Sequence, residues 1–388
     1  MPQKNKKTKK QTDSGKESLA LHKKFRGKIG IAPKLKLTQD LLRLAYTPGV
    51  AAVSSHVASH KEDTNTYTWR GNTVAVVSDG SAVLGLGNIG PEGALPVMEG
   101  KSFLFKSLAG IDAVPIVLGT QDSEEIIAAI KAIAPSFAGI NLEDIAAPRC
   151  FEIEARLKKE LSIPVMHDDQ HGTAMVVLAG LINALRVVKK DKKKIKVVIA
   201  GAGAAGSAVT EMLLGYGITD ILVVDSKGII SLSDISLSGH KKFLAEHTNK
   251  HLVVGTLSDA LMGADVFIGV SKGNTVTAEM IRYMNEKAIV FALANPTPEI
   301  IPEEAMKGGA AVVATGRSDF PNQINNSLGF PGIFRGALDN GVQDITNTML
   351  VRAAESLAKL VKKPAAKALL PKTFDTAVVK AVAKAIRK

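Results

Sequence analysis

The sequence NLEDIAAPRCFEIEARLKKELSIPVMHDDQHGT spans residues 141–173 and contains the polar ends of two predicted strands. The strands are apolar runs around residues 137–140 and 163–166, and the segment between them predicts a helix. Each run is followed by a pair of acids, Glu143 with Asp144 and Asp168 with Asp169. This order predicts an α/β fold with parallel strands, whose carboxyl ends open onto one ligand crevice.

The clustered acids indicate a bound divalent cation. Like charges that share a cavity need a counter-ion, and carboxylates without a nearby thiolate pair suit Mg²⁺ or Mn²⁺ better than zinc. Alternatively, Asp169 only caps the helix that starts near Gly172, while Glu143 and Asp144 are solvated loop residues. Matching chemistry at two strand ends favours the metal.

A second region predicts a nucleotide site. Residues 195–200, IKVVIA, are typical of a strand buried on both faces, and a predicted helix follows the glycine-rich turn. A strand, a tight glycine turn and a helix amino terminus together form the pyrophosphate site of a doubly wound Rossmann-type domain. Six residues make the turn: Gly201, Ala202, Gly203, Ala204, Ala205 and Gly206. The predicted cofactor is NAD or NADP.

Asp225 bears on the choice between these cofactors. It ends the next predicted strand, ILVVD, at the distance expected for the acid that binds the adenosine ribose. A carboxylate there repels a 2′-phosphate and favours NAD, whereas Ser226 and Lys227 could accept that phosphate. The preference stays open at this point.

The chain length predicts two domains, because 388 residues exceed one ordinary core. We place the boundary near residues 165–175. The expected parts are a disordered basic tail at 1–18, an N-terminal α/β domain for substrate and metal at 19–168, and the NAD(P)-binding domain with closing helices at 169–388. Cys150 is the one cysteine, which excludes an intramolecular disulfide and a cysteine metal cluster and is consistent with the cytoplasm.

The net charge of +12 is confined to the two ends of the chain. Residues 1–28 and 352–388 each carry ten basic and two acidic side chains, so residues 29–351 sum to −4. Aromatic content is 4%, and no basic patch is interleaved with aromatic residues, which argues against specific nucleic-acid binding. No run approaches the ~20 apolar residues of a membrane span, and residues 172–185 predict a buried helix instead.

Two further residues stand out in the amino-terminal half. Thr47 and Pro48 predict a sharp helix boundary that holds Tyr46 at a rigid turn, although Tyr46 could simply pack there. Lys101 lies early in a predicted helix among the apolar residues SFLFKSLAG. Burial in such surroundings lowers the pKa of a lysine and makes it a candidate base. The alternative is a surface lysine whose stem covers apolar neighbours.

Polar loops complete the set of candidate site residues. Residues 85–90, GLGNIG, match the glycine pattern formally, but Pro91 and Pro96 interrupt the following segment, so we expect a loop on the substrate side. Asn295 and Asn326 follow later strands, where ligand contact is favoured over a turn role.

Taken together, the motifs resemble those of the malic enzymes of the short bacterial and archaeal type. The resemblance runs from about Leu19 to the end of the chain. It consists of eight motifs in order: YTPGV at 46, SDGSAVLGLGNIG at 78, PVMEGK at 96, NLEDI at 141, HDDQHGTA at 167, GAGAAG at 201, ANPTPE at 294 and NNSLGFPG at 325.

The resemblance implies oxidative decarboxylation of L-malate to pyruvate and CO₂, with NAD(P)⁺ reduced and Mg²⁺ or Mn²⁺ required, in a cytoplasmic homodimer. By motif, the metal ligands are Glu143, Asp144 and Asp169. Lys101 is the general base and Tyr46 the general acid, with its pKa lowered by the nearby lysine. Asn295 and Asn326 contact the substrate or the nicotinamide side.

One position departs from the longer eukaryotic forms. They have an arginine in the LGLG region that binds a substrate carboxylate, and the equivalent residue here is Ala82. The alternative function is another nicotinamide-dependent dehydrogenase, acting on a different hydroxy acid or an amino acid. Such an enzyme needs no divalent metal, so the carboxylate cluster discriminates between the two.

Overall fold

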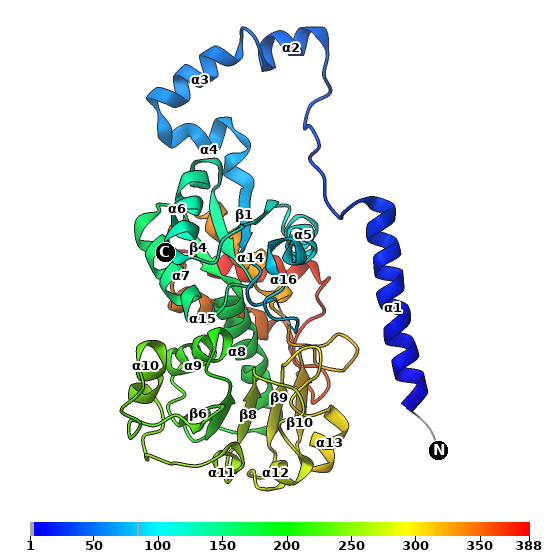
Figure 1. The fold of residues 1–388 in the computed structure, drawn as a ribbon, viewed down its shortest axis with the longest axis vertical. Coiled ribbons are helices and arrows are strands. Elements are labelled where there is room, and N and C mark those ends of the chain that lie inside the picture. Colours follow the sequence, from blue (N-terminus) through cyan, green and yellow to red (C-terminus); the bar gives the residue numbers. More distant parts are fainter. Residues whose placement is uncertain (1–3, 84) are drawn as a thin grey trace.

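Two mainly parallel sheets joined by one long buried helix form the body of the molecule (Figure 1). The structure, a computed structural model, describes residues 4–83 and 85–388, with side chains described from residue 15 onward. The helix between the sheets is α8 (Asp168–Val188). The predicted α/β class is confirmed.

The first sheet has four parallel strands in the order β2-β1-β3-β4. Its strands are β1 (Thr73–Ser78), β2 (Asp112–Val117), β3 (Gly139–Leu142) and β4 (Val165–His167). The helices that connect them are α5 (Gly90–Ala109), α6 (Ser123–Ile133) and α7 (Arg149–Glu160), with a 3₁₀ turn η3 (Ala134–Ser136). Every residue of β1, β3 and β4 is buried, as expected for a parallel sheet covered on both faces.

The second sheet has six strands in the order β10-β9-β8-β5-β6-β7, of which only the short edge strand β7 runs antiparallel. Its strands are β5 (Val197–Ala200), β6 (Ile221–Asp225), β7 (Gly228–Ile229), β8 (Val266–Gly269), β9 (Ile289–Ala292) and β10 (Val312–Thr315). The helices are α9 (Ala204–Tyr216), α10 (Gly239–His247), α11 (Leu257–Leu261), α12 (Ala278–Arg282) and α13 (Pro302–Lys307). Crossing from β5 to β8 reverses the strand order, which places the ligand crevice at the carboxyl end of β5.

Helix α8 belongs to the cores of both sheets. One hydrophobic cluster runs from Val74 and Phe105 through Val177 of α8 to Val197 and Phe291. By length and hydropathy α8 could cross a membrane, but most of it is buried inside this body. The predicted buried helix is therefore confirmed.

The chain ends in helices that pack against this core. They are η4 (Asn326–Leu328), α14 (Phe330–Asp339), α15 (Asn347–Lys359) and α16 (Thr376–Ala385). The ring of Phe105 on α5 packs edge-on against Phe330 and Phe334, with centroid distances of 4.7 and 5.4 Å. The carboxyl-terminal helices thus join the first sheet to the second.

The amino-terminal segment differs from the prediction. Residues 1–18 are expected to be disordered, whereas α1 (Lys4–Phe25) is a 22-residue helix. Lysine, glutamine, glutamate, alanine and leucine are good helix formers, and their summed propensity favours helix where no core is present. Residues 1–3 lie outside the described residues.

Four short helical pieces follow and lead to β1. They are α2 (Gln39–Ala45), α3 (Val50–Ser59), η1 (Lys61–Asp63) and α4 (Thr64–Tyr67), after which η2 (Trp69–Asn72) enters the sheet. Thr38 caps α2 by accepting a 3.2 Å hydrogen bond from Leu41 N–H. In Figure 1, α2 and α3 project beyond the amino end of β1, away from both sheets.

Candidate active site

The carboxyl ends of both sheets open onto one cavity of about 820 Å³. From the first sheet, Asp144 and Asp169 line it, and from the second, Asn295. Asn326 of η4 and the start of α9 complete the wall. A group that binds the acids therefore lies in the same cavity as a ligand of the nucleotide-binding sheet.

Strand register explains why the acids meet. Leu142 of β3 pairs with His167 of β4, so the residues that follow each strand emerge side by side. Asp144 N–H donates a 2.8 Å hydrogen bond to Asp169 Oδ2, which joins the two strand ends. Ligand atoms of Glu143, Asp144 and Asp169 all lie within 4.8 Å of one another. The structure thus brings the three predicted metal ligands together.

Lys101 lies against this group from α5. Its Nζ is 2.7 Å from Glu143 Oε1 and donates a short hydrogen bond to Asp168 Oδ2. The same ammonium lies 4.1 Å from the centroid of the Phe330 ring. Lys101 is buried, so the alternative of a surface lysine is excluded.

The predicted pKa of Lys101 is wrong in direction. Burial lowers the pKa of this ammonium, but the charges of Asp168, Glu143 and Asp169 outweigh that effect and raise it above the ordinary value. For the carboxyl of Glu143, burial raises the pKa well above the usual range, and the positive charge of Lys101 only partly opposes this. The local sequence suggested apolar surroundings, whereas the fold supplies acids from two distant strands.

The residues present fit a hard divalent cation. Four carboxylates, those of Glu143, Asp144, Asp168 and Asp169, lie around a single ammonium. A buried excess of negative charge is costly without a compensating cation. Oxygen ligands alone, held by backbone geometry within one small volume, suit Mg²⁺ or Mn²⁺.

The predicted substrate residues lie around the same cavity. Asn326 Nδ2 donates a 2.6 Å hydrogen bond to Asp168 Oδ2, the same oxygen that accepts a hydrogen bond from Lys101. Asn295 lines the opposite wall together with Gly85, where an added Cβ would come within 2.9 Å of Asn295 O. Ala82 also lines the cavity. Of the described lining residues, Lys272 is the one with a cationic side chain.

Sequence reasoning missed the role of Asp168. It predicted a metal ligand in the second residue of the Asp168–Asp169 pair and left the first without a function. In the structure Asp168 is fully buried and accepts hydrogen bonds from both Lys101 and Asn326. Gly172 leaves room for it, since an added Cβ would lie 1.8 Å from Asp168 Oδ1. The sequence signal for this role was the pair of aspartates shortly before Gly172, a glycine within a helix.

The glycine turn after β5 has the geometry of a pyrophosphate site. Gly201 has φ +118°, and an added Cβ would meet Val270 O at 2.7 Å. At Gly206 a Cβ would lie 1.8 Å from Gly201 O, so this glycine permits close packing of α9 on the turn. Nothing lies within 4 Å of a Cβ at Gly203, where the backbone faces open space at the helix amino terminus. Gly201 and Gly206 therefore allow close packing of the backbone, whereas Gly203 leaves space for a ligand to approach.

A second cavity, of about 660 Å³, continues from this turn toward Asp225. Gly201, Ala202 and Gly203 line it, whereas Ala204 and Ala205 line the cavity that holds the acids. The Lys241 ammonium lies 2.5 Å from Asp225 Oδ2. Burial raises the pKa of Asp225, but Lys241 and the Lys227 N–H outweigh burial and lower it. The Asp225 carboxylate is therefore ionised and paired with a cation.

Replacing Gly206 with alanine will destabilise the fold by about 3 kcal/mol, because the new methyl group overlaps the Gly201 carbonyl. Thermal unfolding of the cofactor-free protein measures this. Gly203→Ala is the matched control: it should unfold at the wild-type temperature yet bind NAD(P) at least about tenfold more weakly, since its methyl occupies the phosphate approach. Equal unfolding temperatures for both variants would contradict the assigned packing role.

Within one chain, the structure does not bring Tyr46 to Lys101. Tyr46 directly follows α2 and is 66% exposed. Its backbone forms hydrogen bonds with residues of α2 and α3. Its N–H donates to Leu42 O at 3.0 Å, and its carbonyl accepts from Val50 N–H at 2.7 Å. Among the described residues, no contact joins Tyr46 to Lys101 of the same chain, because α2 and α3 point away from the sheet.

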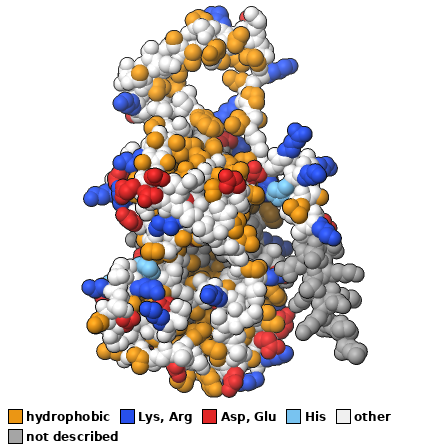
Figure 2. Space-filling view, in the orientation of Figure 1, with side chains coloured by type: hydrophobic (Ala, Val, Ile, Leu, Met, Phe, Trp, Pro, Cys, Tyr) orange, Lys and Arg blue, Asp and Glu red, His pale blue; other side chains and the backbone are white. Residues whose placement is uncertain are grey.

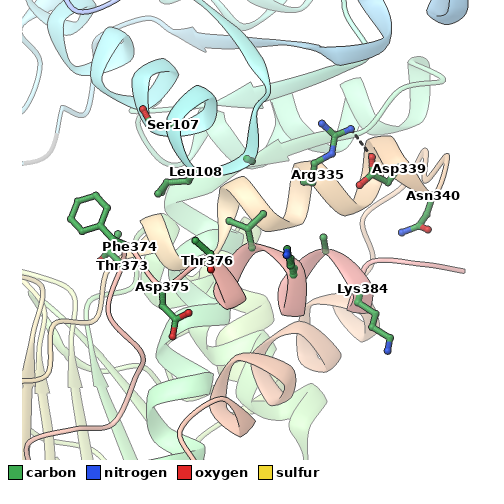
Figure 3. A pocket seen from close by; sticks show the side chains of 14 residues that line it. Ser107, Leu108, Arg335, Asp339, Asn340, Thr373, Phe374, Asp375, Thr376 and Lys384 are labelled. Atoms are coloured by element: carbon green, nitrogen blue, oxygen red, sulfur yellow. Dashed lines mark ion pairs between the residues drawn. The ribbon is translucent and has the colours of Figure 1, made fainter.

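A third cavity, of about 700 Å³, lies apart from the acids (Figure 3). It is formed by the end of α5 with α14 and α16, and Figure 3 shows Phe374 at its edge and the 2.7 Å ion pair of Arg335 and Asp339 along one wall. No group of acids that could hold a metal lies here among the described residues. This cavity is not part of the candidate active site.

Comparisons with known proteins agree with the geometry. The family models "Malic enzyme, N-terminal domain" and "Malic enzyme, NAD binding domain" match residues 27–158 and 170–388. The chain is 51% identical to the bifunctional malic/malolactic enzyme of Bacillus subtilis over 381 residues, covering 96% of this chain and 92% of the relative. It is 52% identical to the NAD-dependent malic enzyme of Geobacillus stearothermophilus, covering 93% and 76%.

A solved structure shows the same fold. The crystal structure of the NAD-dependent malic enzyme from Thermotoga maritima superposes with a TM-score of 0.92 at 50% identity, covering 95% of this chain and 98% of that one. Both halves of the chain, with their acids and glycine turn, are thus accounted for by a single family. The chain belongs to the malic enzyme family.

Proposed function

We propose that this protein oxidatively decarboxylates L-malate to pyruvate and CO₂ while reducing NAD⁺ or NADP⁺, with Mg²⁺ or Mn²⁺ required. The observation that carries the proposal is the shared cavity: Asp144 and Asp169 line the same space as Asn295 and the first residues of α9. A substrate held by the acids would therefore share this space with the cofactor that the second sheet binds. An ordinary hydride-transfer dehydrogenase does not need this acidic cluster.

Glu143, Asp144 and Asp169 would hold the cation, which when bound polarises the C2 oxygen of the substrate. We assign Lys101 as the base that removes the proton of the substrate hydroxyl as hydride leaves C2. A cation held by the same carboxylates would offset the negative charges that raise the pKa of Lys101, and would so favour its neutral amine. Asp168 and Glu143 fix the Lys101 Nζ in place through their contacts. Asn326 orients Asp168 and presents its amide to the cavity. The 2-oxo acid then loses CO₂, and C3 of the resulting enol takes up a proton.

We assign Tyr46 as the acid that protonates C3, and Asn295 with Asn326 as contacts of the substrate and nicotinamide. Apolar side chains from three separate stretches of the chain, Val176, Leu293 and Ile324, line the same cavity. They limit water around the enol, so that the proton comes from a positioned phenol.

We also propose the setting in which the enzyme works: the cytoplasm, as a homodimer, on free malate. The mildly acidic body with basic ends supports no specific nucleic-acid partner. The apolar α8 packs within the protein core, which supports activity without a membrane.

Initial rates with malate, Mn²⁺ and each nicotinamide cofactor test the activity. We expect stoichiometric NAD(P)H and pyruvate, and loss of turnover after EDTA treatment that Mn²⁺ restores. Hydride transfer from malate that survives EDTA, without CO₂ release, would instead identify a metal-independent dehydrogenase.

Lys241 should govern the use of NADP⁺. Its ammonium neutralises Asp225, so a 2′-phosphate meets a paired rather than a bare carboxylate. Lys241→Gln should lower kcat/KM for NADP⁺ about tenfold, since a hydrogen bond to a charged group is worth ~1.5 kcal/mol at a partly exposed site. The value for NAD⁺ should change about twofold or less. Lys242→Gln, at the exposed neighbouring residue, is the control, and equal losses for both cofactors would exclude this role.

A further inference from the structure

Residues 29–68, which we call the arm, expose an unusual amount of apolar surface. No residue of α2, α3, η1 or α4 is buried. Ten large apolar side chains of the arm are exposed: Ile29, Ile31, Leu35, Leu37, Leu42, Leu44, Tyr46, Val50, Val53 and Tyr67. Figure 2 shows this surface over the projecting helices. An apolar surface of this extent marks a contact with another molecule.

Contacts within the arm hold α3 against η1 and α4. His56 on α3 binds Asp63 at 2.7 Å, and the His56 ring lies edge-on to Tyr67 at 4.9 Å. The base of the arm is tied to the first sheet through Asn72, which donates to Gly110 O at 2.9 Å. This base is at the amino end of β1, whereas the acids lie beyond the carboxyl ends. To reach the acids of its own chain, the arm would have to reverse from the amino end of β1 to the carboxyl end, whereas docking on a second copy leaves its direction unchanged.

The body offers a matching surface beside the active site. Helix α5, which carries Lys101, exposes Leu95, Val97 and Phe103, and the loop before it exposes Leu86 and Ile89. On α5, Phe103 lies one turn before Ser107, so both are on the same face of the helix. Ser107 lines the cavity of Figure 3, and the 82% exposed Phe374 borders it. We call the exposed side chains of Leu86, Ile89, Leu95, Val97 and Phe103 the α5 strip, and Phe103 brings it to the face of α5 that reaches that cavity.

The site also lacks its own phenol. Of the three other tyrosines, Tyr67 packs against His56, Tyr216 stacks under the Lys192 ammonium at 3.6 Å, and Tyr283 donates to Glu279 at 3.1 Å. The described residues around Lys101 are carboxylates, an amide and a phenylalanine ring, none of which is a phenol.

We propose that two copies exchange arms, so that each active site combines the body of one chain with Tyr46 of the partner subunit. The inference rests on the proposed function for the role of the phenol. A twofold axis makes the exchange reciprocal and closes the assembly at a dimer. Each partner contributes ~800 Å² to a standard interface, and the ten exposed apolar side chains of the arm supply surface of the kind such an interface buries.

Mixed dimers test the exchange. Tyr46→Phe and Lys101→Ala chains carry different affinity tags, are co-expressed, and the heterodimer is isolated through both tags. If the arms are exchanged, one site of each heterodimer combines an intact Lys101 with an intact Tyr46, and the heterodimer has about half the wild-type turnover. If each site uses its own arm, both sites carry one lesion and the heterodimer is as inactive as either homodimer, which overturns the proposal.

A second measurement does not depend on activity. Wild-type protein should sediment as a dimer of 40.9 kDa chains, and Leu44→Asp on the arm should sediment as a monomer. Leu252→Asp is the matched control, because Leu252 is 57% exposed against 58% for Leu44 but lies outside the arm and the α5 strip. A wild-type monomer, or a dimer that survives Leu44→Asp, overturns arm exchange. If the wild-type protein is a dimer but does not turn over malate, the proposed function is wrong and the contact between arm and body is retained.

Discussion

Replacing Lys101 with alanine will lower kcat for malate oxidation about a thousandfold, within the ~10²–10⁴-fold that positioned acid–base groups contribute. The variant loses the group that removes the hydroxyl proton. It also removes the single ammonium among the surrounding carboxylates, so the affinity of this cluster for a cation should rise. Stopped-flow measurement of NAD(P)H formation gives the rate, and the Mn²⁺ dependence of the unfolding temperature gives the cation affinity.

Lys106→Ala is the matched control for this variant. Lys106 lies on the same helix, is largely exposed, and pairs with Asp112 at 2.7 Å, outside the site. It should retain turnover within about twofold, as surface ion pairs contribute ~0–1 kcal/mol. A Lys101→Ala enzyme with wild-type kcat would remove this lysine from the mechanism.

Asp169→Asn will separate cation binding from folding. Asparagine has the same shape and its Oδ1 can still accept the hydrogen bond from Asp144 N–H, so the two strand ends stay joined. The site loses one of three clustered anionic ligands. We expect kcat/KM at limiting Mn²⁺ to fall about a thousandfold, because a Lewis-acid cation supplies several kcal/mol of charge stabilisation.

Titration with Mn²⁺ followed by thermal unfolding checks this result directly. Wild-type protein should gain ~2.7 kcal/mol of stability at a hundred times the dissociation constant, whereas Asp169→Asn should show no gain at that concentration. Asp220→Asn, at an exposed position remote from the cluster, should match the wild type. An unchanged Mn²⁺ response in Asp169→Asn would exclude the assigned metal site.

The acidic cluster could be predicted because it depends on the residues that directly follow two recognisable strands. Acids that directly follow buried parallel strands must emerge at the same edge, and the register of Leu142 with His167 then brings them together. The glycine turn was predictable for a similar reason. A strand followed by a tight turn and a helix needs residues without a side chain at fixed spacing, and Gly201, Gly203 and Gly206 have that spacing. Both features depend on short stretches of chain.

The environment of Lys101 could not be predicted in this way. Its neighbours in sequence are apolar, yet the groups that raise its pKa come from residues 42 and 67 positions later. The same limit applies to Tyr46, whose rigid turn was visible in the sequence but whose direction depends on how α3 binds η1 and α4. Contacts between residues far apart in the chain produce no recognisable pattern in the local sequence.

Helix α8 has a consequence for how the protein denatures. Since its side chains complete the cores of both sheets, neither sheet keeps a full hydrophobic interior once the other opens. The body should therefore melt in a single cooperative calorimetric transition, and a protease cut at the surface turn around Asp191 should not release an independently stable half.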